Sequence, residues 1–173
     1  MTFFTADLHL DHARIIEYAR RPFSSVEEMN ETIADRWNER IKDRDTVYVL
    51  GDFAFSERSA LQFLSRLRGR KILIRGNHDG KSVCRASGWH DVRDYHSLSA
   101  NQQSYILFHY PIEEWNKRHH GAIHLHGHQH NRQPVTGNRR LDVGVDGNDF
   151  RPWHIDEINT LVMPMNAENR KHG

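Results

Sequence analysis

The stretch KILIRGNHD (residues 71–79) joins a short apolar run to a glycine and three polar residues. The apolar run contains β-branched residues and has the length of a buried strand. The glycine permits a sharp turn directly after that strand. Asn77 offers a carbonyl oxygen to a cation, and His78 offers a ring nitrogen to a metal or a proton to a leaving group. We expect these residues at the carboxyl end of a strand, where α/β folds bind ligands.

The same arrangement, an apolar strand that ends in Asp, Asn or His, occurs four more times along the chain. One such turn is explained by Asn and Asp as ordinary turn formers. Five strand ends with the same placement are better explained by one shared site. The strands are expected at residues 2–6, 46–50, 71–74, 103–108 and 122–126, and the residues that follow them are Asp7, His9, Asp52, Asn77, His78, His109, His128 and His130.

These side chains form a donor set for metal ions. The donors are nitrogen and oxygen without a thiolate, which suits Mn, Fe, Zn, Co or Ni more than Ca or Mg. They are too many for one tetrahedral ion. Two ions that share Asp52 fit the number, because a carboxylate has two oxygens. The sequence therefore predicts two divalent transition-metal ions, with manganese as the first candidate, and leaves the roles of His12, His124 and His126 open.

Composition limits the class of protein. The 173 residues predict one domain, 1–173, with a polar tail from about residue 164. Lys plus Arg is 24 and Asp plus Glu is 23, so 24 − 23 leaves a net charge of +1, which does not favour a nucleic-acid scaffold. A single cysteine excludes an internal disulfide and favours the cytoplasm. The N-terminus does not read as a signal peptide, and no segment is apolar enough to span a membrane.

Helices are expected between these strands. The most regular pattern covers about residues 25–42, where apolar residues recur at helical spacing after a capping box formed by Ser24 and Glu27. A hairpin is expected from residues 89–98 and 103–108. The remaining predictions are helices at 13–19, 57–67 and 81–87, a strand at 139–145, and a helix up to residue 162 that Asp156 caps.

The sequence resembles the calcineurin-like metallophosphoesterases, in particular the small bacterial and phage members that begin Asp-x-His-x-x-His, a pattern that His12 completes. The resemblance rests on five blocks in the order of the family, which span most of the chain. They are Asp7-x-His9, Gly51-Asp52, Gly76-Asn77-His78-Asp79, His109 and Gly127-His-x-His130. One departure is Phe53-Ala54-Phe55, where some members of the family place a polar residue.

The resemblance implies an α/β fold in four layers, α-β-β-α, with two mixed sheets packed face to face and an open site. It also implies roles for the strand-end residues. One ion would be held by Asp7, His9, Asp52 and His130. The second would be held by Asp52, Asn77, His109 and His128. His78 would lie beside the substrate as the catalytic residue.

The expected chemistry is phosphoester hydrolysis. Two cations neutralise the phosphate and lower the pKa of a water between them, so that a bridging hydroxide attacks phosphorus in line with the leaving oxygen. His78 can stabilise the charge or protonate the leaving group. On the substrate side we expect His12, Arg14 and Arg21, with Arg132 as a further arginine near the motifs.

The substrate expected from the sequence is a phosphodiester of small or nucleotide-like compounds. The alternatives are a phosphomonoesterase, a nuclease or nucleic-acid-processing phosphodiesterase, and a non-catalytic interaction scaffold. A nuclease needs a basic, aromatic-lined groove, which the net charge of +1 does not favour. A scaffold would be expected to lack ligands, and none of the expected ones is missing. Neither the oligomeric state nor the natural substrate follows from the sequence.

Overall fold

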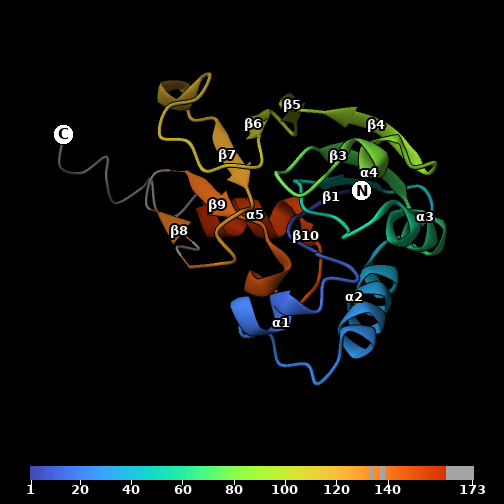
Figure 1. The fold of residues 1–173 in the computed structure, drawn as a ribbon. Coiled ribbons are helices and arrows are strands. Elements are labelled where there is room, and N and C mark those ends of the chain that lie inside the picture. Colours follow the sequence, from blue (N-terminus) through green and yellow to red (C-terminus); the bar gives the residue numbers. More distant parts are fainter. Residues whose placement is uncertain (133–134, 137–138, 163–173) are drawn as a thin grey trace.

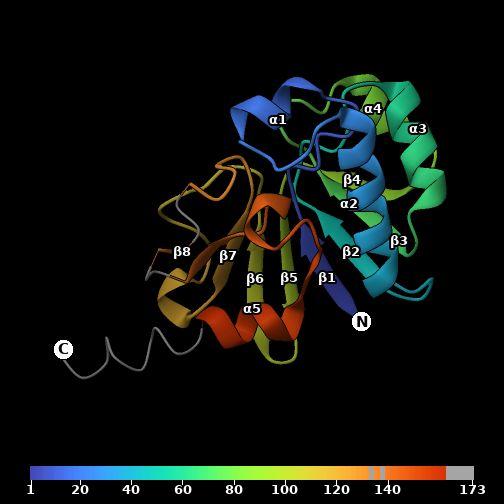
Figure 2. The ribbon, with the colours of Figure 1, turned by 90° about the horizontal axis from the view of Figure 1, so that it is seen from below.

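The computed structural model describes residues 1–132, 135–136 and 139–162, and it contains two mixed sheets of five strands each. The sheets pack face to face around a shared apolar layer (Figures 1 and 2). This confirms the expected α/β class with two mixed sheets. The polar tail expected from residue 164 lies outside the described residues. No helix in the described part of the chain is both long and apolar enough to cross a membrane.

The first sheet has the strand order β10-β1-β2-β3-β4. Its four long strands run parallel, and β10 pairs antiparallel with β1 at one edge. The bounds are β1 (Thr2–Thr5), β2 (Thr46–Val49), β3 (Arg70–Ile74), β4 (Trp89–Arg93) and β10 (Trp153–His154).

The second sheet has the strand order β5-β6-β7-β9-β8. Its three central strands β6, β7 and β9 run parallel, and the two edge strands are antiparallel to their neighbours. The bounds are β5 (His96–Ala100), β6 (Gln103–Leu107), β7 (Ile123–His126), β8 (Val135–Thr136) and β9 (Arg140–Asp142).

Helices cover the outer face of the first sheet (Figure 2). They are α1 (Arg14–Tyr18), α2 (Val26–Arg40), α3 (Glu57–Arg66) and α4 (Lys81–Arg85). The helix α5 (Ile155–Val162) contributes three side chains to the layer between the sheets. The outer face of the second sheet packs on Trp115 and Ala122, which flank the short 3₁₀ turn η1 (Arg118–His120). A second 3₁₀ turn, η2 (Val145–Gly147), follows β9.

Alternation along the strands separates the two apolar layers. Phe3 packs under the helices, whereas Phe4 packs between the sheets. In β2, Val47 and Val49 face the helices and Tyr48 faces the other sheet. Because both faces are covered, these strands are apolar throughout, as is typical of parallel strands. The sheet core is therefore a direct consequence of the period-two placement of large apolar residues.

The N-terminus of α2 differs by one residue from the expected capping box. Ser25, not Ser24, is the N-cap, and its side chain accepts a hydrogen bond from the backbone N–H of Glu28. The Glu28 carboxylate in turn accepts from the backbone N–H of Ser24 at 2.8 Å. The sequence allows either Ser24 or Ser25 to be the N-cap. The hydrogen bonds of Glu28 select Ser25.

The strand expected at residues 89–98 is wrong as one element, because the chain changes sheets within it. β4 pairs parallel with β3, whereas β5 pairs antiparallel with β6. The hairpin turn that follows β5 is as expected. Local alternation shows that a segment is extended, but the partner of each strand is distant in sequence. The expected cap at Asp156 is also wrong: α5 begins at Ile155, and the carboxylate of Glu157 accepts from the backbone N–H of His154 at 2.7 Å.

Candidate metal centre

The loops that carry the expected ligands meet because their strands are parallel and in register. Thr5 of β1 lies opposite Val49 of β2, so the two strands end at one level. The loops beyond them are joined by a hydrogen bond from the His9 N–H to the Asp52 carbonyl at 2.9 Å. In the second sheet, the Gly127 N–H donates to the His109 carbonyl at 3.0 Å. Both sheets thus present their ligand loops at the carboxyl ends of their strands.

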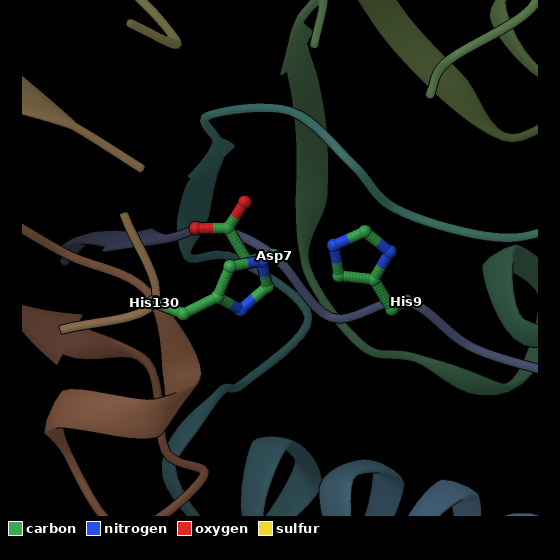
Figure 3. Close-up of side chains that lie close together, drawn as sticks. All are labelled: Asp7, His9 and His130. Atoms are coloured by element: carbon green, nitrogen blue, oxygen red, sulfur yellow. The ribbon is translucent and has the colours of Figure 1, made fainter. Parts of the chain in front are cut away.

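The side chains on these loops form two groups that could each hold a metal ion. Within each group, one donor atom per residue lies within 4.8 Å of the others. The first group is Asp7, His9 and His130, and the second is Asp52, His109 and His128. Figure 3 shows the first group, with Asp7 and His9 on the loop after β1 and His130 approaching from a separate segment. Each group therefore combines donors from both sheets.

Asp52 lies between the two groups. Its Oδ2 atom is 3.6 Å from Nε2 of His9 and 3.5 Å from Nε2 of His109. The carboxylate is buried, with 2% of its surface exposed. Its other oxygen, Oδ1, accepts a hydrogen bond from the backbone N–H of His78 at 2.9 Å. One oxygen is therefore anchored while the other faces both groups.

Two buried polar atoms in the first group have no hydrogen-bond partner among the described residues. They are Oδ1 of Asp7 and Nε2 of His9. An unpaired polar atom in the interior costs about 1–3 kcal/mol, so such atoms normally have a partner. A divalent cation satisfies a carboxylate oxygen and a neutral ring nitrogen together. The residues present therefore fit a bound metal ion.

The second group shows the same need at His109. Its Nδ1 lies 2.7 Å from the carbonyl of Leu50, so this nitrogen carries the proton and donates it. In the neutral ring Nε2 then has only a lone pair, yet it lies 2.9 Å from Oδ1 of Asn77. The same oxygen lies 3.0 Å from Nδ1 of His128. A cation bound among these three atoms would turn the acceptor contacts into ligand contacts, as expected for Asn77 beside the second group.

The backbone at the site is strained. Five of the seven expected ligands have a positive φ, a region that non-glycine residues rarely occupy. The five are Asp7 (φ 56°), His9 (51°), Asp52 (55°), His128 (70°) and His130 (50°). Such strain costs about 1–3 kcal/mol per residue and gathers at functional sites. The fold therefore holds these donors in place against their local preference.

Glycine is required where two loops come together. A Cβ atom at Gly51, which has φ +90°, would lie 2.3 Å from Nδ1 of His109. At Gly127, a Cβ atom would lie 2.5 Å from Cβ of Ala6 and 2.6 Å from Oδ2 of Asp7. The glycines that follow the strands thus let donors from different sheets approach one another.

Burial controls the charges at the site. It raises the pKa of Asp7 well above the usual range, and the nearby carboxylates of Asp142 and Asp52 raise it further. Burial lowers the pKa of His9 to about 2, and the guanidinium of Arg21 adds to that shift. The ring is thus neutral, as a metal ligand must be, whereas the Asp7 carboxylate is costly without a cation. A bound metal ion would offset this cost.

Three carboxylates that the sequence analysis did not assign support the ligand loops. Asp79 accepts hydrogen bonds from the backbone N–H groups of Asp52, Phe53 and Gly76 at 2.8, 2.9 and 2.8 Å. Asp142 accepts from the N–H groups of Asn131 and Gly144. Asp146 lies 3.0 Å from Nδ1 of His130, which leaves Nε2 of that ring available. Asp79 closes the block Gly76-Asn77-His78-Asp79, and Asp146 follows the strand expected at residues 139–145; these positions were the signals in the sequence.

Arg21 does not face the substrate, contrary to expectation. Its side chain is 0% exposed and forms an ion pair with Asp146 at 2.8 Å. It also donates to the carbonyls of Leu8 at 2.9 Å and Asp7 at 2.6 Å. The backbone carbonyls of Leu8 and Asp7 are buried and need donors, which the Arg21 guanidinium provides. The sequence pattern does not show this contact. Arg21 is therefore a positioning residue for the loop that carries Asp7.

Other predicted residues lie at the opening of the site. His78 is exposed, with its ring 5.4 Å from that of His9 and 6.2 Å from that of His12. The ring of Phe55, which is 67% exposed, stacks on His12 at 5.2 Å. Arg14 is exposed in the first turn of α1. The departure at residues 53–55 thus places an aromatic side chain, not a polar one, at the rim.

His124 and His126 are buried in β7 and belong to neither donor group. Nδ1 of His124 donates to the carbonyl of Ile106 at 3.1 Å, and its Nε2 accepts from the N–H of Ile112 at 3.3 Å. Burial lowers the pKa of each ring to about 4. His124 therefore acts as a neutral structural residue that ties β7 to β6 and to the segment beyond it.

Comparison with known proteins places the chain in a family. The sequence model of the calcineurin-like phosphoesterases matches residues 2–111. An uncharacterised protein of Methanocaldococcus jannaschii is 32% identical, over 92% of this chain and 90% of that protein. The gene 66 protein of Mycobacterium phage D29 is 30% identical, over 92% of this chain and 94% of that protein.

The fold is also similar to a solved structure. A protein of unknown function from Aquifex aeolicus superposes with a TM-score of 0.77 at 26% identity. The match covers 94% of this chain and 99% of that chain. Because the family model matches more than half of this chain, the chain belongs to the calcineurin-like phosphoesterase family.

Proposed function

We propose that the protein is a two-metal-dependent phosphoester hydrolase that acts on phosphodiesters of small or nucleotide-like compounds. The observation that carries the proposal is the position of Asp52, whose Oδ2 lies 3.6 and 3.5 Å from one histidine of each donor group. A structural ion pair does not require one carboxylate oxygen to face a histidine of each donor group, whereas a carboxylate that bridges two metal ions does.

Seven side chains would hold the ions. Asp7, His9 and His130 would bind one ion and Asn77, His109 and His128 the other, with Asp52 shared. The nitrogen and oxygen donors favour manganese or another first-row transition metal over calcium. When bound, two such ions neutralise a phosphate and supply a water of lowered pKa. The protein contributes the orientation: the hydrogen bonds to Asp79 and Asp146 hold the donor loops in place.

His78 is the proposed catalytic residue. It belongs to neither donor group among the described residues, and its exposed ring lies at the opening beside His9 and His12. Its backbone N–H is fixed by Asp52, so the ring position depends on the same carboxylate that joins the groups. From there the imidazole can give a proton to the departing oxygen. That role supports diesters, whose alkoxide leaving groups need protonation.

We further propose that residues 1–173 act as one domain in the cytoplasm. The single cysteine, Cys84, provides no internal disulfide.

The test is a panel of substrates measured with Mn²⁺, Ni²⁺ and Zn²⁺ alongside elemental analysis. Bis(p-nitrophenyl) phosphate, p-nitrophenyl phosphate, a cyclic nucleotide and a single-stranded oligonucleotide separate a diesterase from a phosphomonoesterase and a nuclease. We expect bis(p-nitrophenyl) phosphate, the small diester, to be hydrolysed fastest. A protein loaded with two metal equivalents that hydrolyses none of them would instead be a binding scaffold.

The role of His78 is tested with His78→Ala, with His119→Ala as the control. His119 is an exposed histidine of η1, away from the ligand loops. General-acid catalysis contributes about 10²–10⁴-fold, so His78→Ala should lose that much turnover on the cyclic nucleotide, whose alkoxide leaving group needs a proton, and keep two metal ions. Loss of one metal ion from His78→Ala would identify this residue as a ligand and contradict the proposal.

A further inference from the structure

A pocket of about 300 Å³ lies beside the metal centre. It is lined by Tyr18, Ala19, Arg20, His130 and Arg132. His130 is also a member of the first donor group, so the pocket and that group share a wall. The volume is at the lower end of the range for small-molecule sites. A substrate held at the metal centre can therefore extend into this pocket.

Two arginines of the pocket have side chains without a partner among the described residues. Neither Arg20 nor Arg132 forms a side-chain hydrogen bond or ion pair there. Arg21, the neighbour of Arg20, donates hydrogen bonds to the Asp146 carboxylate and to two backbone carbonyls. Arg36, on α2, pairs with Asp149. The two free guanidinium groups thus remain available to a ligand.

The charge of this pocket differs from that of the other cavities. No carboxylate is among the described residues that line it. A cavity of about 440 Å³ near α5 is lined by Asp156 and Glu157, and one of about 180 Å³ near η1 is lined by Glu113 and Glu114. Of these three cavities, only the one beside the metal centre carries cations without acidic residues. It is therefore suited to an anion.

Two segments far apart in the sequence build the pocket. Arg20 follows α1 in a left-handed conformation, with φ +53°, and its N–H bonds to the carbonyl of Glu17. Arg132, two residues after the candidate ligand His130, closes a turn through its N–H to the carbonyl of Gln129. Tyr18, which also lines the pocket, is 61% exposed. An exposed aromatic ring next to arginines can stack on a flat group such as a nucleobase.

We propose that this pocket is a subsite for a second anionic group of the substrate, bound by Arg20 and Arg132. The inference rests on the proposed phosphodiester hydrolysis and narrows the substrate to diesters that carry a further phosphate. Guanidinium groups suit this ligand, since they bind phosphate through paired, charge-assisted hydrogen bonds. The second phosphate could be the terminal phosphate of a nucleotide or the next phosphate of a single strand, and the chemistry of recognition is the same.

Two matched substrates test the proposal. One is thymidine 5′-(p-nitrophenyl phosphate), a diester with no second phosphate, and the other is the same compound with a 3′-phosphate. We expect a lower KM for the second compound. Arg20→Ala and Arg132→Ala should each raise KM for that compound about five- to tenfold and leave kcat little changed, since each removes charge-assisted hydrogen bonds that an exposed arginine makes to the phosphate.

The first substrate keeps the two proposals apart. Its hydrolysis tests the hydrolase function, whereas the ratio of the two KM values tests the subsite. The matched control is Arg44→Ala, which removes one positive charge from the exposed turn before β2, at the opposite end of that strand from Asp52. If the control changes KM as much as the pocket variants do, the effect is one of net charge and the subsite is refuted.

Binding provides a readout that does not depend on turnover. Thymidine 3′,5′-bisphosphate should bind more tightly than thymidine 5′-monophosphate by calorimetry, and the advantage should disappear in the double variant Arg20→Ala, Arg132→Ala. Equal affinities in the wild-type protein would overturn the proposal even if no substrate is hydrolysed. A short oligo-dT that competes better than the bisphosphate would identify a strand as the source of the second phosphate. The reverse order would identify a mononucleotide.

Discussion

The ligand loops of the first sheet and the loop after β7 in the second sheet differ in burial and charge. Asp7, His9 and Asp52, on the first sheet, are 0%, 4% and 2% exposed. His128 is exposed and His130 half-buried. The first sheet supplies both carboxylates of the donor groups, whereas the loop after β7 supplies only imidazoles. The family model, which matches residues 2–111, includes the first set and not the second.

This difference teaches how the site is assembled. The carboxylates of Asp7 and Asp52 are buried and accept hydrogen bonds from backbone N–H groups, and the imidazoles of His128 and His130 approach them from the second sheet. Neither sheet alone completes a donor group, since His130 joins Asp7 and His9, and His109 and His128 join Asp52. Metal binding should therefore hold the two sheets together at this edge. Four predictions follow from this comparison.

The largest effect is expected from Asp52→Asn, because this first-sheet carboxylate lies between the two groups and is the proposed shared ligand. Removal of its charge should lower turnover about 10³-fold or more, the value of several kcal/mol of transition-state stabilisation, and lower the metal content below two. Steady-state kinetics and elemental analysis measure both. Asp43→Asn, in an exposed turn before β2, is the control. Full metal content in Asp52→Asn would show that the groups do not share this ligand.

The next prediction compares the buried carboxylates behind the two sets of loops. Asp79→Ala leaves three backbone N–H groups without an acceptor, and Asp142→Ala leaves two. At about 1–3 kcal/mol for each buried orphan, Asp79→Ala should destabilise by about 3 kcal/mol or more, and Asp142→Ala by less. Urea unfolding in the presence of a chelator measures both. The opposite order would place the more rigid anchor in the second sheet.

Metal removal tests whether the ions join the sheets. Mn²⁺ at 100 times its dissociation constant should stabilise the wild-type protein by about 2.7 kcal/mol per site relative to the chelated form. In the double variant His128→Ala, His130→Ala most of that gain should disappear, although every first-sheet donor remains. Thermal unfolding with and without EDTA is the measurement. An undiminished gain would show that the first sheet binds metal without the second.

The smallest effect concerns His124 in the second sheet. Burial lowers the pKa of this ring to about 4, from an ordinary value of 6.5. Between those values the unfolded chain binds a proton that the folded protein does not, so stability falls as the pH drops below 6.5. From pH 6.5 to pH 5 the loss is roughly 2 kcal/mol at 1.36 kcal/mol per pH unit. His124→Gln should show a shallower dependence in urea titrations with chelator; an unchanged slope would contradict a buried neutral ring.

Much of the fold follows from local patterns. The strands β1, β2, β3, β6 and β7 have alternating or continuous apolar residues that end in glycine or polar residues, and parallel strands of that kind collect their ends at one edge. The predicted sheet class and family are confirmed. The break between β4 and β5 was not foreseen, because the two strands find their partners in different sheets, and pairing is a contact between distant residues.

The donor residues were predictable because few side-chain types bind metal ions and because these residues directly follow strands in the sequence. The burial of each side chain and its hydrogen-bond partners were not predictable. Arg20 and Arg21 are the same residue type at adjacent positions. Yet the Arg21 guanidinium is buried and pairs with Asp146, whereas Arg20 lines a pocket. The sequence by itself determined which atoms could bind metal. Only the tertiary structure decided which of them lie next to Asp52, because the distance between two side chains is set by the packing of both sheets.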